Sequence, residues 1–358
     1  MATFQADDLK KLCVDLLKKV NVPNEDAIIV SNALIQADLE GVGSHGISRI
    51  PIYLQRLLEG RINPTPKISF LQNSHSVLIV DGDNGLGQVV TYRAIKEGIK
   101  IARKSGVCAI GINHSNHFGA ASYYCQLACN EKMIAIGFTN SPPGIAPWGG
   151  KKAFFGTNPI AFGFPTGNQI PVIIDLSTSV VARGKIILAA KQGESIPDGW
   201  AIDRNGEMTN DPNEALKGAV LPMGGAKGSA LALAVEILTG ILSGASYGPH
   251  INNIYSDEKS DPANVGHFFI LLDIEKFMPF ELFSNNLGQL LEEMKKIPTV
   301  PGNDEIRYPG ERKHRNYEKN LLNGISLSIE VEQELVALSS QLEVPFPSPI
   351  YTSEQNLH

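Results

Sequence analysis

Alternation between helical and strand patterns is the feature that most limits the fold of this chain. Hydrophobic residues recur at helical spacing over residues 6–20, 24–40 and 47–59, which predicts a helical N-terminal unit. Short apolar runs with strand character follow, and amphipathic segments lie between many of them. These runs occupy residues 76–81, 107–112, 134–139, 161–164, 172–175 and 268–272. Strands that alternate with helices are typical of the α/β class, which we therefore predict.

The length of 358 residues and the hydrophobic content of 43% are sufficient for a large buried core. We expect two units. The first is helical and combines residues 1–75 with residues 310–358, which include a predicted helix at residues 330–341. The second unit, residues 76–309, contains the predicted strands and forms the core.

Charge and terminal sequence limit the possible partners. The formal net charge is -6 and the basic residues are scattered, so we expect no nucleic-acid partner and no anionic lipid surface. The N-terminus lacks the basic and apolar regions of a secretory signal, and the longest apolar run, near residues 231–242, is interrupted by Glu236 and Gly240. The four cysteines are irregularly placed, which argues against a disulfide framework. We predict a cytoplasmic protein with reduced thiols and no membrane span.

The segment from residue 38 to residue 53 carries the strongest chemical signal. Three glycines allow close approach of another molecule, and His45, Arg49 and Tyr53 follow at intervals of four residues. In a helix these side chains would share one face. Pro51 makes that face approximate, because a proline fits only in the first turn of a helix, which would then begin near Ser48. An imidazole, a guanidinium and a phenol that converge can bind a small carboxylate and transfer a proton beside it.

Two glycine-rich segments fail the spacing of nucleotide-binding motifs. Gly85-Leu86-Gly87 follows a predicted strand, but Val90 stands where the dinucleotide fingerprint needs a third glycine. In the segment from Gly224 to Ser229, Lys227 precedes the last glycine, so the phosphate-loop spacing is absent as well. This second segment still begins a helix predicted to continue to about residue 243, and a helix start with a lysine attracts anions.

A metal site is the alternative from another class of function. His114 and His117 are three residues apart, so they could bind zinc in a hydrolase or a binding protein. The interpretation without a metal is stronger, because no neighbouring cysteine, aspartate or glutamate completes a ligand set. We therefore expect no metal.

Several motifs in order along the chain resemble the malate and L-lactate dehydrogenase family that is distinct from the Rossmann-type lactate dehydrogenases. They cover nearly the whole chain. They are Ser44-His45-Gly46 with Arg49 and Tyr53, Asn116-His117-Phe118-Gly119 with Tyr123, Thr139-Asn140-Ser141, Gly156-Thr157-Asn158-Pro159, Asp175-Leu176-Ser177-Thr178-Ser179, Ala182-Arg183-Gly184-Lys185, Gly199-Trp200-Ala201 and Lys227-Gly228. The resemblance implies an oxidoreductase that uses NAD or NADP to interconvert 2-hydroxy and 2-oxo acids. It also implies a mixed sheet of non-Rossmann topology, a core that binds the cofactor and carries out catalysis, and a homodimer or a higher homo-oligomer with the dimer as its basic unit.

The substrate and the site residues follow from this resemblance and from the chemistry of the reaction. Arg49 is expected to bind the substrate carboxylate through two parallel hydrogen bonds, with Ser44 and Tyr53 beside it. His45 and His117 both match positions of a catalytic histidine, and the sequence favours His45 without excluding His117. The resemblance places the cofactor against Ser141, Asp175, Leu176, Ser177, Lys227, Pro309, Gly310 and Glu311. L-malate is the preferred substrate, and L-lactate, ureidoglycolate and sulfolactate are the alternatives within the family.

Overall fold

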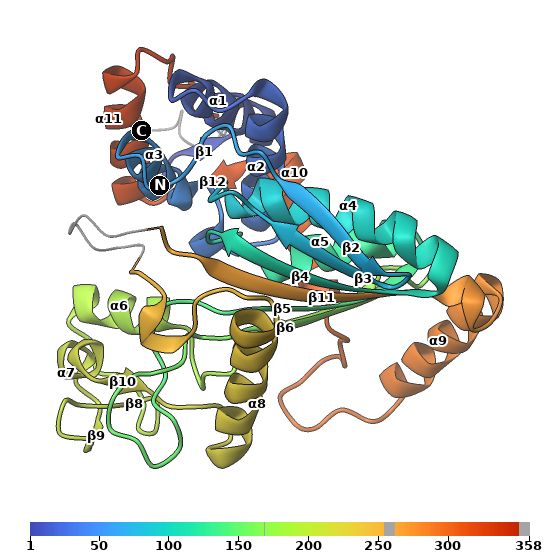
Figure 1. Ribbon diagram of the computed structural model, residues 1–358. Helices are drawn as coiled ribbons and strands as arrows, with labels where there is room; N and C mark the ends of the chain where they lie inside the picture. Colours follow the sequence, from blue (N-terminus) through green and yellow to red (C-terminus); the bar gives the residue numbers. More distant parts are fainter. Residues whose placement is uncertain (168, 254–261, 351–358) are drawn as a thin grey trace.

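A seven-stranded sheet forms the centre of the computed structural model, which describes residues 1–167, 169–253 and 262–350 (Figure 1). The strand order is β2-β3-β4-β11-β5-β6-β7, and β3 and β4 run parallel while the other neighbours run antiparallel. The strands span Ser69–Ser74 (β2), Val77–Asp81 (β3), Val107–Ser115 (β4), Met133–Thr139 (β5), Ile160–Phe164 (β6), Val172–Leu176 (β7) and Val265–Asp273 (β11). The predicted α/β class and mixed sheet are confirmed.

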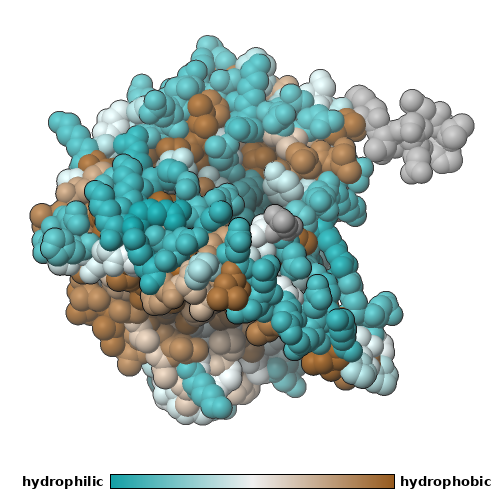
Figure 2. Space-filling model, turned by 90° about the vertical axis from the view of Figure 1, so that its right-hand side faces the viewer, coloured by the Kyte–Doolittle hydropathy of each residue, from teal (hydrophilic) through white to brown (hydrophobic). Residues whose placement is uncertain are grey.

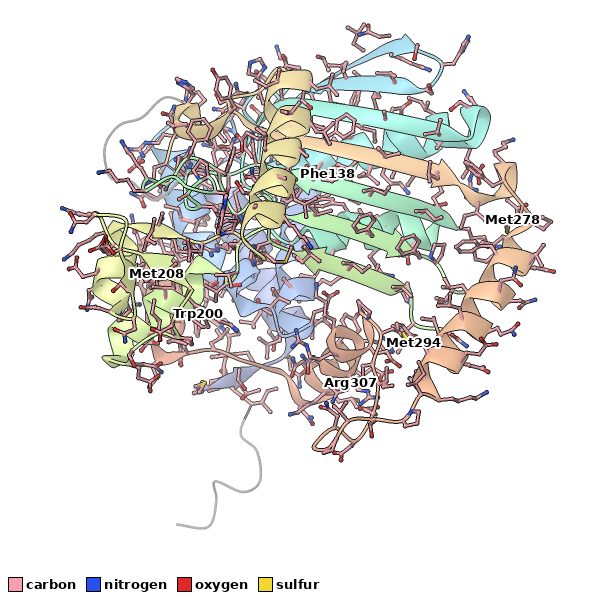
Figure 3. All side chains as sticks on the ribbon, turned by 90° about the horizontal axis from the view of Figure 1, so that it is seen from below. Phe138, Trp200, Met208, Met278, Met294 and Arg307 are labelled. Carbon is pink, nitrogen blue, oxygen red and sulfur yellow. The ribbon has the colours of Figure 1, made fainter. Side chains whose placement is uncertain are left out.

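Helices cover both faces of this sheet. On one face lie α4 (Gly87–Ser105) and α5 (Ala121–Asn130), and on the other lies α8 (Ala226–Glu236), which continues as a π-helical segment, Ile237–Leu242 (Figures 1 and 3). In Figure 3, α8 crosses the underside of the strands close to Phe138. Because both faces are covered, β11 is a nearly continuous apolar run and not an alternating one.

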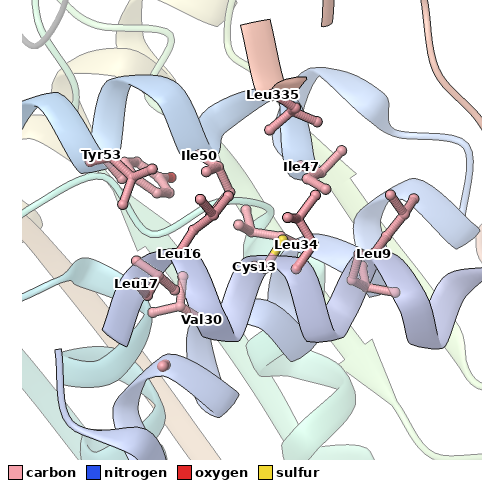
Figure 4. Packing of buried hydrophobic residues seen from close by; sticks show 14 of the residues in the cluster. Leu9, Cys13, Leu16, Leu17, Val30, Leu34, Ile47, Ile50, Tyr53 and Leu335 are labelled. Atoms are coloured by element: carbon pink, nitrogen blue, oxygen red, sulfur yellow. The ribbon is translucent and has the colours of Figure 1, made fainter. Parts of the chain in front are cut away.

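The helical unit packs beside one end of the sheet. It contains α1 (Ala6–Lys19), α2 (Asn24–Leu39), α3 (Ile50–Leu58), α10 (Glu311–Asn323) and α11 (Ile329–Gln341), together with the two-stranded sheet of β1 (Thr3–Phe4) and β12 (Ile325–Ser326). Leu9, Cys13 and Leu16 follow one another at intervals of three or four residues on α1 and are buried against α2, α3 and α11 (Figure 4). Each fully buried leucine of this kind contributes about 1.5–3 kcal/mol to folding.

A smaller lobe and a helical arm complete the described part of the chain. The lobe has a three-stranded sheet of order β10-β8-β9, near which Figure 3 labels Trp200 and Met208. Its elements are α6 (Arg183–Gln192), β8 (Ala201–Ile202), β9 (Met208–Thr209), α7 (Pro212–Lys217) and β10 (Ala219–Val220), and the arm is α9 (Phe280–Lys295). Short 3-10 turns cover Gly43–His45, Ile47–Arg49, Gly248–His250 and Ile274–Lys276.

Some element boundaries differ from the sequence-based ones. The helix predicted over residues 47–59 begins only at Ile50, because Pro51 occupies its first turn. The long helix predicted to residue 243 becomes π-helical at Ile237. Strand β2 has no counterpart among the predicted strands, since all six of its residues are exposed and show no alternation of buried and exposed positions. It pairs with β3, so the sheet begins before residue 76.

Two further findings concern the predictions about membrane spans and cysteines. Within the described ranges, the helices are too short or too polar to cross a bilayer. Cys13, Cys108, Cys125 and Cys129 are all buried thiols.

Candidate active site

Two 3-10 turns between α2 and α3 carry His45 and Arg49. The buried carboxylate of Asp38, at the end of α2, accepts a hydrogen bond from the backbone N–H of Ile47 at 2.7 Å. A Cβ atom on Gly46 would lie 1.9 Å from Asp38 Oδ1, so only glycine fits here. The two predicted residues therefore stand on a turn held by Asp38, and the helical face proposed for them with Tyr53 does not exist.

His117 lies on the loop after β4 and meets the 3-10 turns. The register of β4 and β11 shifts between Val265 and His267, which is the kind of β-bulge that redirects side chains at a strand end. The rings of His45 and His117 stack with their centroids 5.7 Å apart. The phenol oxygen of Tyr53 lies 2.7 Å from Nδ1 of His117. The structure thus brings together three of the predicted residues from two distant segments of sequence.

Arg49 and Ser44 belong to the same cluster. Nε of Arg49 donates a hydrogen bond to the backbone oxygen of Ser44 at 2.6 Å, and Oγ of Ser44 lies 3.0 Å from Nδ1 of His45. The first contact fixes the plane of the guanidinium beside the imidazoles. A planar guanidinium in a fixed orientation is suited to bind a carboxylate.

The two imidazoles are held in their neutral form. Burial and then the positive charge of Arg49 lower the pKa of His45 to about 4. Burial lowers the pKa of His117 well below its usual range, and His45 and Arg49 act in the same direction. A cluster that disfavours positive charge on its histidines favours an anion as its ligand, because an anion offsets the potential of Arg49.

Asp175 is the next-to-last residue of β7 and belongs to a second group of charges next to the imidazoles. Its Oδ2 accepts a hydrogen bond from the backbone N–H of Ser122 at 3.0 Å. Nζ of Lys313, on α10, lies 3.7 Å from both Asp175 Oδ2 and Glu40 Oε2 and donates to Ser122 Oγ at 2.8 Å. The charges of Asp175 and Lys313 act on the pKa of His45 in opposite directions, because the carboxylate favours the protonated imidazole and the ammonium disfavours it.

A cavity of about 420 Å³ opens beside Lys313. Its lining includes Glu40, Ser122 and Gly310. Gly310 packs closely on β7, because a Cβ atom there would lie 2.5 Å from the backbone oxygen of Pro171. The backbone oxygen of Pro309 accepts a hydrogen bond from Ile173 at 3.0 Å, so the predicted loop lies against the strand that carries Asp175.

The other predicted cofactor residues have different surroundings. Glu311 is buried, and its carboxylate contacts Lys295 and accepts a hydrogen bond from Tyr308 N, so the protein itself already binds that carboxylate. Ser141 Oγ accepts a hydrogen bond from Thr157 N at 3.1 Å, and Ser177 Oγ donates to Ser179 O at 3.3 Å. Leu176 at the end of β7 is 37% exposed. Lys227 lies exposed in the first turn of α8, on the sheet face opposite α4.

The zinc alternative lacks a ligand set. His114 is exposed and its Nδ1 lies 3.1 Å from Asp81 Oδ2, whereas Nδ1 of His117 faces Tyr53. In the part of the chain that the structure describes, no three histidine, cysteine or acidic side chains are grouped closely enough to hold a metal ion. The structure thus gives no support to a hydrolase organised by these two histidines.

Comparison with known proteins places this chain in a family. The sequence profile of the family described as malate/L-lactate dehydrogenase matches residues 4–336. The chain belongs to the malate/L-lactate dehydrogenase family. The resemblance inferred from the motifs is therefore confirmed, and so is the assignment as a dehydrogenase.

Relatives of this dehydrogenase match it along nearly their whole length. A malate dehydrogenase of Pyrococcus horikoshii is 41% identical over 346 residues, which cover 94% of this chain and 95% of that protein. An NAD(+)-dependent ureidoglycolate dehydrogenase of Escherichia coli is 32% identical over 331 residues, covering 92% and 94%. The solved sulfolactate dehydrogenase of Methanocaldococcus jannaschii is 40% identical with a TM-score of 0.90, covering 97% and 98%.

Several polar residues of the candidate site were not predicted from the sequence. Lys313 stands among four other charged or titratable residues, Glu311, Arg312, His314 and Arg315, so nothing local distinguishes it. Glu40 and Asp38 lie in the segment that was singled out, but their roles depend on contacts with α10 and with the 3-10 turns. Only the folded arrangement identifies these side chains.

Proposed function

We propose that the protein interconverts L-malate and oxaloacetate, with NAD or NADP as its coenzyme. The observation that carries this proposal is the cluster in which Arg49 stands beside two neutral imidazoles, at the edge of a group of charges that includes Asp175. Malate dehydrogenases are among its relatives. L-lactate, ureidoglycolate and sulfolactate remain the alternative substrates within the family, because each is a 2-hydroxy acid with the same reacting group.

Arg49 binds the substrate carboxylate in this proposal. Its guanidinium is oriented by the hydrogen bond from Nε to Ser44 O, so the edge that carries the two Nη groups meets the substrate in one direction. Two parallel hydrogen bonds from a guanidinium fix both the position and the rotation of a carboxylate. Ser44 and Tyr53 flank the same space and orient the neighbouring oxygen atom of the substrate.

His117 exchanges the proton with the substrate oxygen. The sequence favours His45 for this role, but the geometry favours His117, because the phenol of Tyr53, itself bonded to the buried Gln88, engages its Nδ1 and leaves Nε2 for the substrate. Among the described residues, the hydrogen-bond partner of Nδ1 of His45 is the exposed hydroxyl of its neighbour Ser44. His45 then packs over the substrate as the second imidazole. A proton donor next to the oxygen stabilises the negative charge that develops there.

The coenzyme fits the groups around the cavity. Asp175 can accept hydrogen bonds from ribose hydroxyls, Lys313 supplies a cation, and Gly310, which packs closely on β7, lines the cavity. Ser141, Ser177 and Lys227 complete the set by family resemblance. When bound, the coenzyme gives or accepts the hydride of the reaction.

A coenzyme-oxidation assay tests this function. Purified protein is mixed with NADH or NADPH and a panel of oxaloacetate, pyruvate and other 2-oxo acids, and absorbance at the nicotinamide band is followed. We expect turnover with at least one pair and the highest kcat/KM with oxaloacetate. A His117→Asn variant is the matched control and should lose most of the rate. Lack of turnover with every pair would contradict the proposal.

We also propose a cytoplasmic homodimer with two structural units. Four buried cysteines without disulfides are typical of a reducing compartment. Exposed apolar side chains on and after α8 supply a surface for a second copy of the chain, as discussed below. The division into residues 1–75 with 310–358 and residues 76–309 is supported by separate hydrophobic clusters, one centred on α1 to α3 and one on the sheet.

A further inference from the structure

The glycine turn before α4 packs directly on the loop that carries His117. A Cβ atom on Gly87 would lie 2.1 Å from the backbone oxygen of Asn116 and 2.6 Å from that of His117. Only glycine permits this approach. The turn of Gly85 to Gly87, which lacks the dinucleotide-binding spacing, therefore places the next residue, Gln88, beside the imidazole cluster.

Gln88 is the buried end of a chain of hydrogen bonds that leads to His117. Its side chain is fully buried, and its Nε2 donates to the phenol oxygen of Tyr53 at 2.9 Å. That oxygen lies 2.7 Å from His117 Nδ1. Within the described ranges, Oε1 of Gln88 is buried and has no hydrogen-bond partner.

This chain has two arrangements that differ by a half-turn of the Gln88 amide. With the N–H group toward Tyr53, the phenol donates its proton to Nδ1, and Nε2 of the neutral imidazole carries the hydrogen. With Oε1 toward Tyr53, the phenol donates to Gln88 and accepts from Nδ1–H, so Nε2 has a lone pair. Each arrangement leaves one end of the amide without a partner, so neither is strongly preferred.

Only the second arrangement makes His117 a base. Oxidation of a 2-hydroxy acid requires that Nε2 takes the hydroxyl proton while the hydride leaves the carbon atom, which yields an imidazolium. In the reverse direction that imidazolium returns the Nε2 proton to the substrate oxygen as the hydride arrives. The neutral form of the imidazole, which starts the oxidation and ends the reduction, therefore carries its hydrogen on Nδ1 and donates it in a hydrogen bond to the oxygen of Tyr53.

We propose that Gln88 is a positioning residue that sets the tautomer of His117 through Tyr53. This inference rests on the proposed function, in which His117 exchanges the proton. Gln88 does not touch the substrate. It determines whether Nε2 of His117 presents a hydrogen or a lone pair, and the orientation described here, with the amide N–H toward Tyr53, corresponds to hydrogen on Nε2 in the free protein.

The tautomer is measured directly by NMR of protein labelled with ¹⁵N-histidine. In the wild type we expect the His117 signals of the Nε2–H tautomer. In Gln88→Glu the carboxyl oxygen accepts a hydrogen bond from the phenol of Tyr53, whose oxygen then accepts one from His117 Nδ1. The signals should therefore move to those of the Nδ1–H tautomer. Identical His117 tautomers in the two proteins would overturn the proposal. This spectrum does not depend on turnover. An inactive wild type would therefore contradict the proposed function, while the spectrum would still show which tautomer His117 adopts.

Kinetics supply the second measurement. Gln88→Met should lower kcat in both directions by about tenfold or more with an unchanged KM for the coenzyme, because proton transfer and not binding is impaired. Tyr53→Phe breaks the same chain at the next residue, and it should reproduce the loss if Gln88→Met does not fold.

Thr91→Val is the matched control. Thr91 lies three residues further along α4, is equally buried, and in the part of the chain that the structure describes has no hydrogen-bond partner for its hydroxyl. This variant should keep kcat within about twofold, since it perturbs the helix without touching the chain to His117. Wild-type kcat in Gln88→Met, or an equal loss in Thr91→Val, would overturn the assignment.

Discussion

One hydrogen bond fixes the orientation of the Arg49 side chain. Its Nε is bound to the backbone oxygen of Ser44, so the orientation of the guanidinium is set before a ligand arrives. A lysine has the charge but lacks the planar fork that donates two parallel hydrogen bonds. The identity of this residue therefore matters beyond its charge.

At this scale we predict the effect of Arg49→Lys. KM for the 2-oxo acid should rise by about tenfold or more, whereas kcat should fall less, because the lost hydrogen bonds are made in the substrate complex as well as in the transition state. Steady-state kinetics measures both values. Arg315→Lys changes an arginine of an exposed ion pair with Glu305 and serves as the control. Equal KM values in Arg49→Lys and wild type would contradict the role in binding.

The 3-10 turns between α2 and α3 are the element on which the site depends. Asp38 is buried beneath them and binds Ile47 N–H, and burial raises the pKa of its carboxyl to about 7. An aspartate in an unfolded chain titrates near pH 4. Between these two pH values the folded protein therefore holds a proton that the unfolded chain has lost.

The resulting prediction concerns stability and pH. Because the folded state binds the extra proton, this group makes the free energy of unfolding fall as pH rises from about 4 to about 7, by at most about 1.4 kcal/mol per pH unit. Asp38→Asn should abolish that contribution while keeping an oxygen near Ile47 N–H. Urea unfolding of both proteins at pH 5 and pH 8 measures the difference. The buried histidines are common to both, so identical pH dependence would show that Asp38 does not titrate in this range.

An apolar face dominates one side of the whole molecule. Hydrophobic side chains gather in the lower left of Figure 2, the side on which α8 lies in Figure 1. On α8 and the π-helical segment, Leu231, Leu233, Ile237, Ile241 and Leu242 are between 42% and 60% exposed. An exposed stripe of this kind is typical of a surface that another protein covers.

The proposed homodimer uses this face, which leads to a prediction. The double variant Ile237→Lys with Ile241→Lys puts two charges four residues apart on the stripe and should shift the protein from dimer to monomer, because buried like charges oppose association. Sedimentation velocity measures the mass. Leu322→Lys replaces a side chain on α10 that is 81% exposed, and it should leave the mass unchanged. A monomeric wild type would contradict the dimer itself.

The sequence alone determined the parts of this protein whose signals are local. Helical spacing located α1 and α2, apolar runs located six strands of the central sheet, and the residue types of the segments around His45 and His117 indicated the family. Each of these signals is carried by residues within a few positions of one another. Local spacing also placed Pro51 in the first turn of a helix.

Tertiary structure decided the features that depend on residues far apart in sequence. β11 enters the sheet between β4 and β5 although it follows them by more than 120 residues, and β2 becomes a strand only because β3 pairs with it. Lys313 reaches Asp175 from α10, and Gln88 reaches Tyr53 because Gly87 allows α4 to approach the loop of His117. A lysine or a glutamine looks the same at every position of a sequence. Only burial and packing against a particular partner give Lys313 and Gln88 their roles.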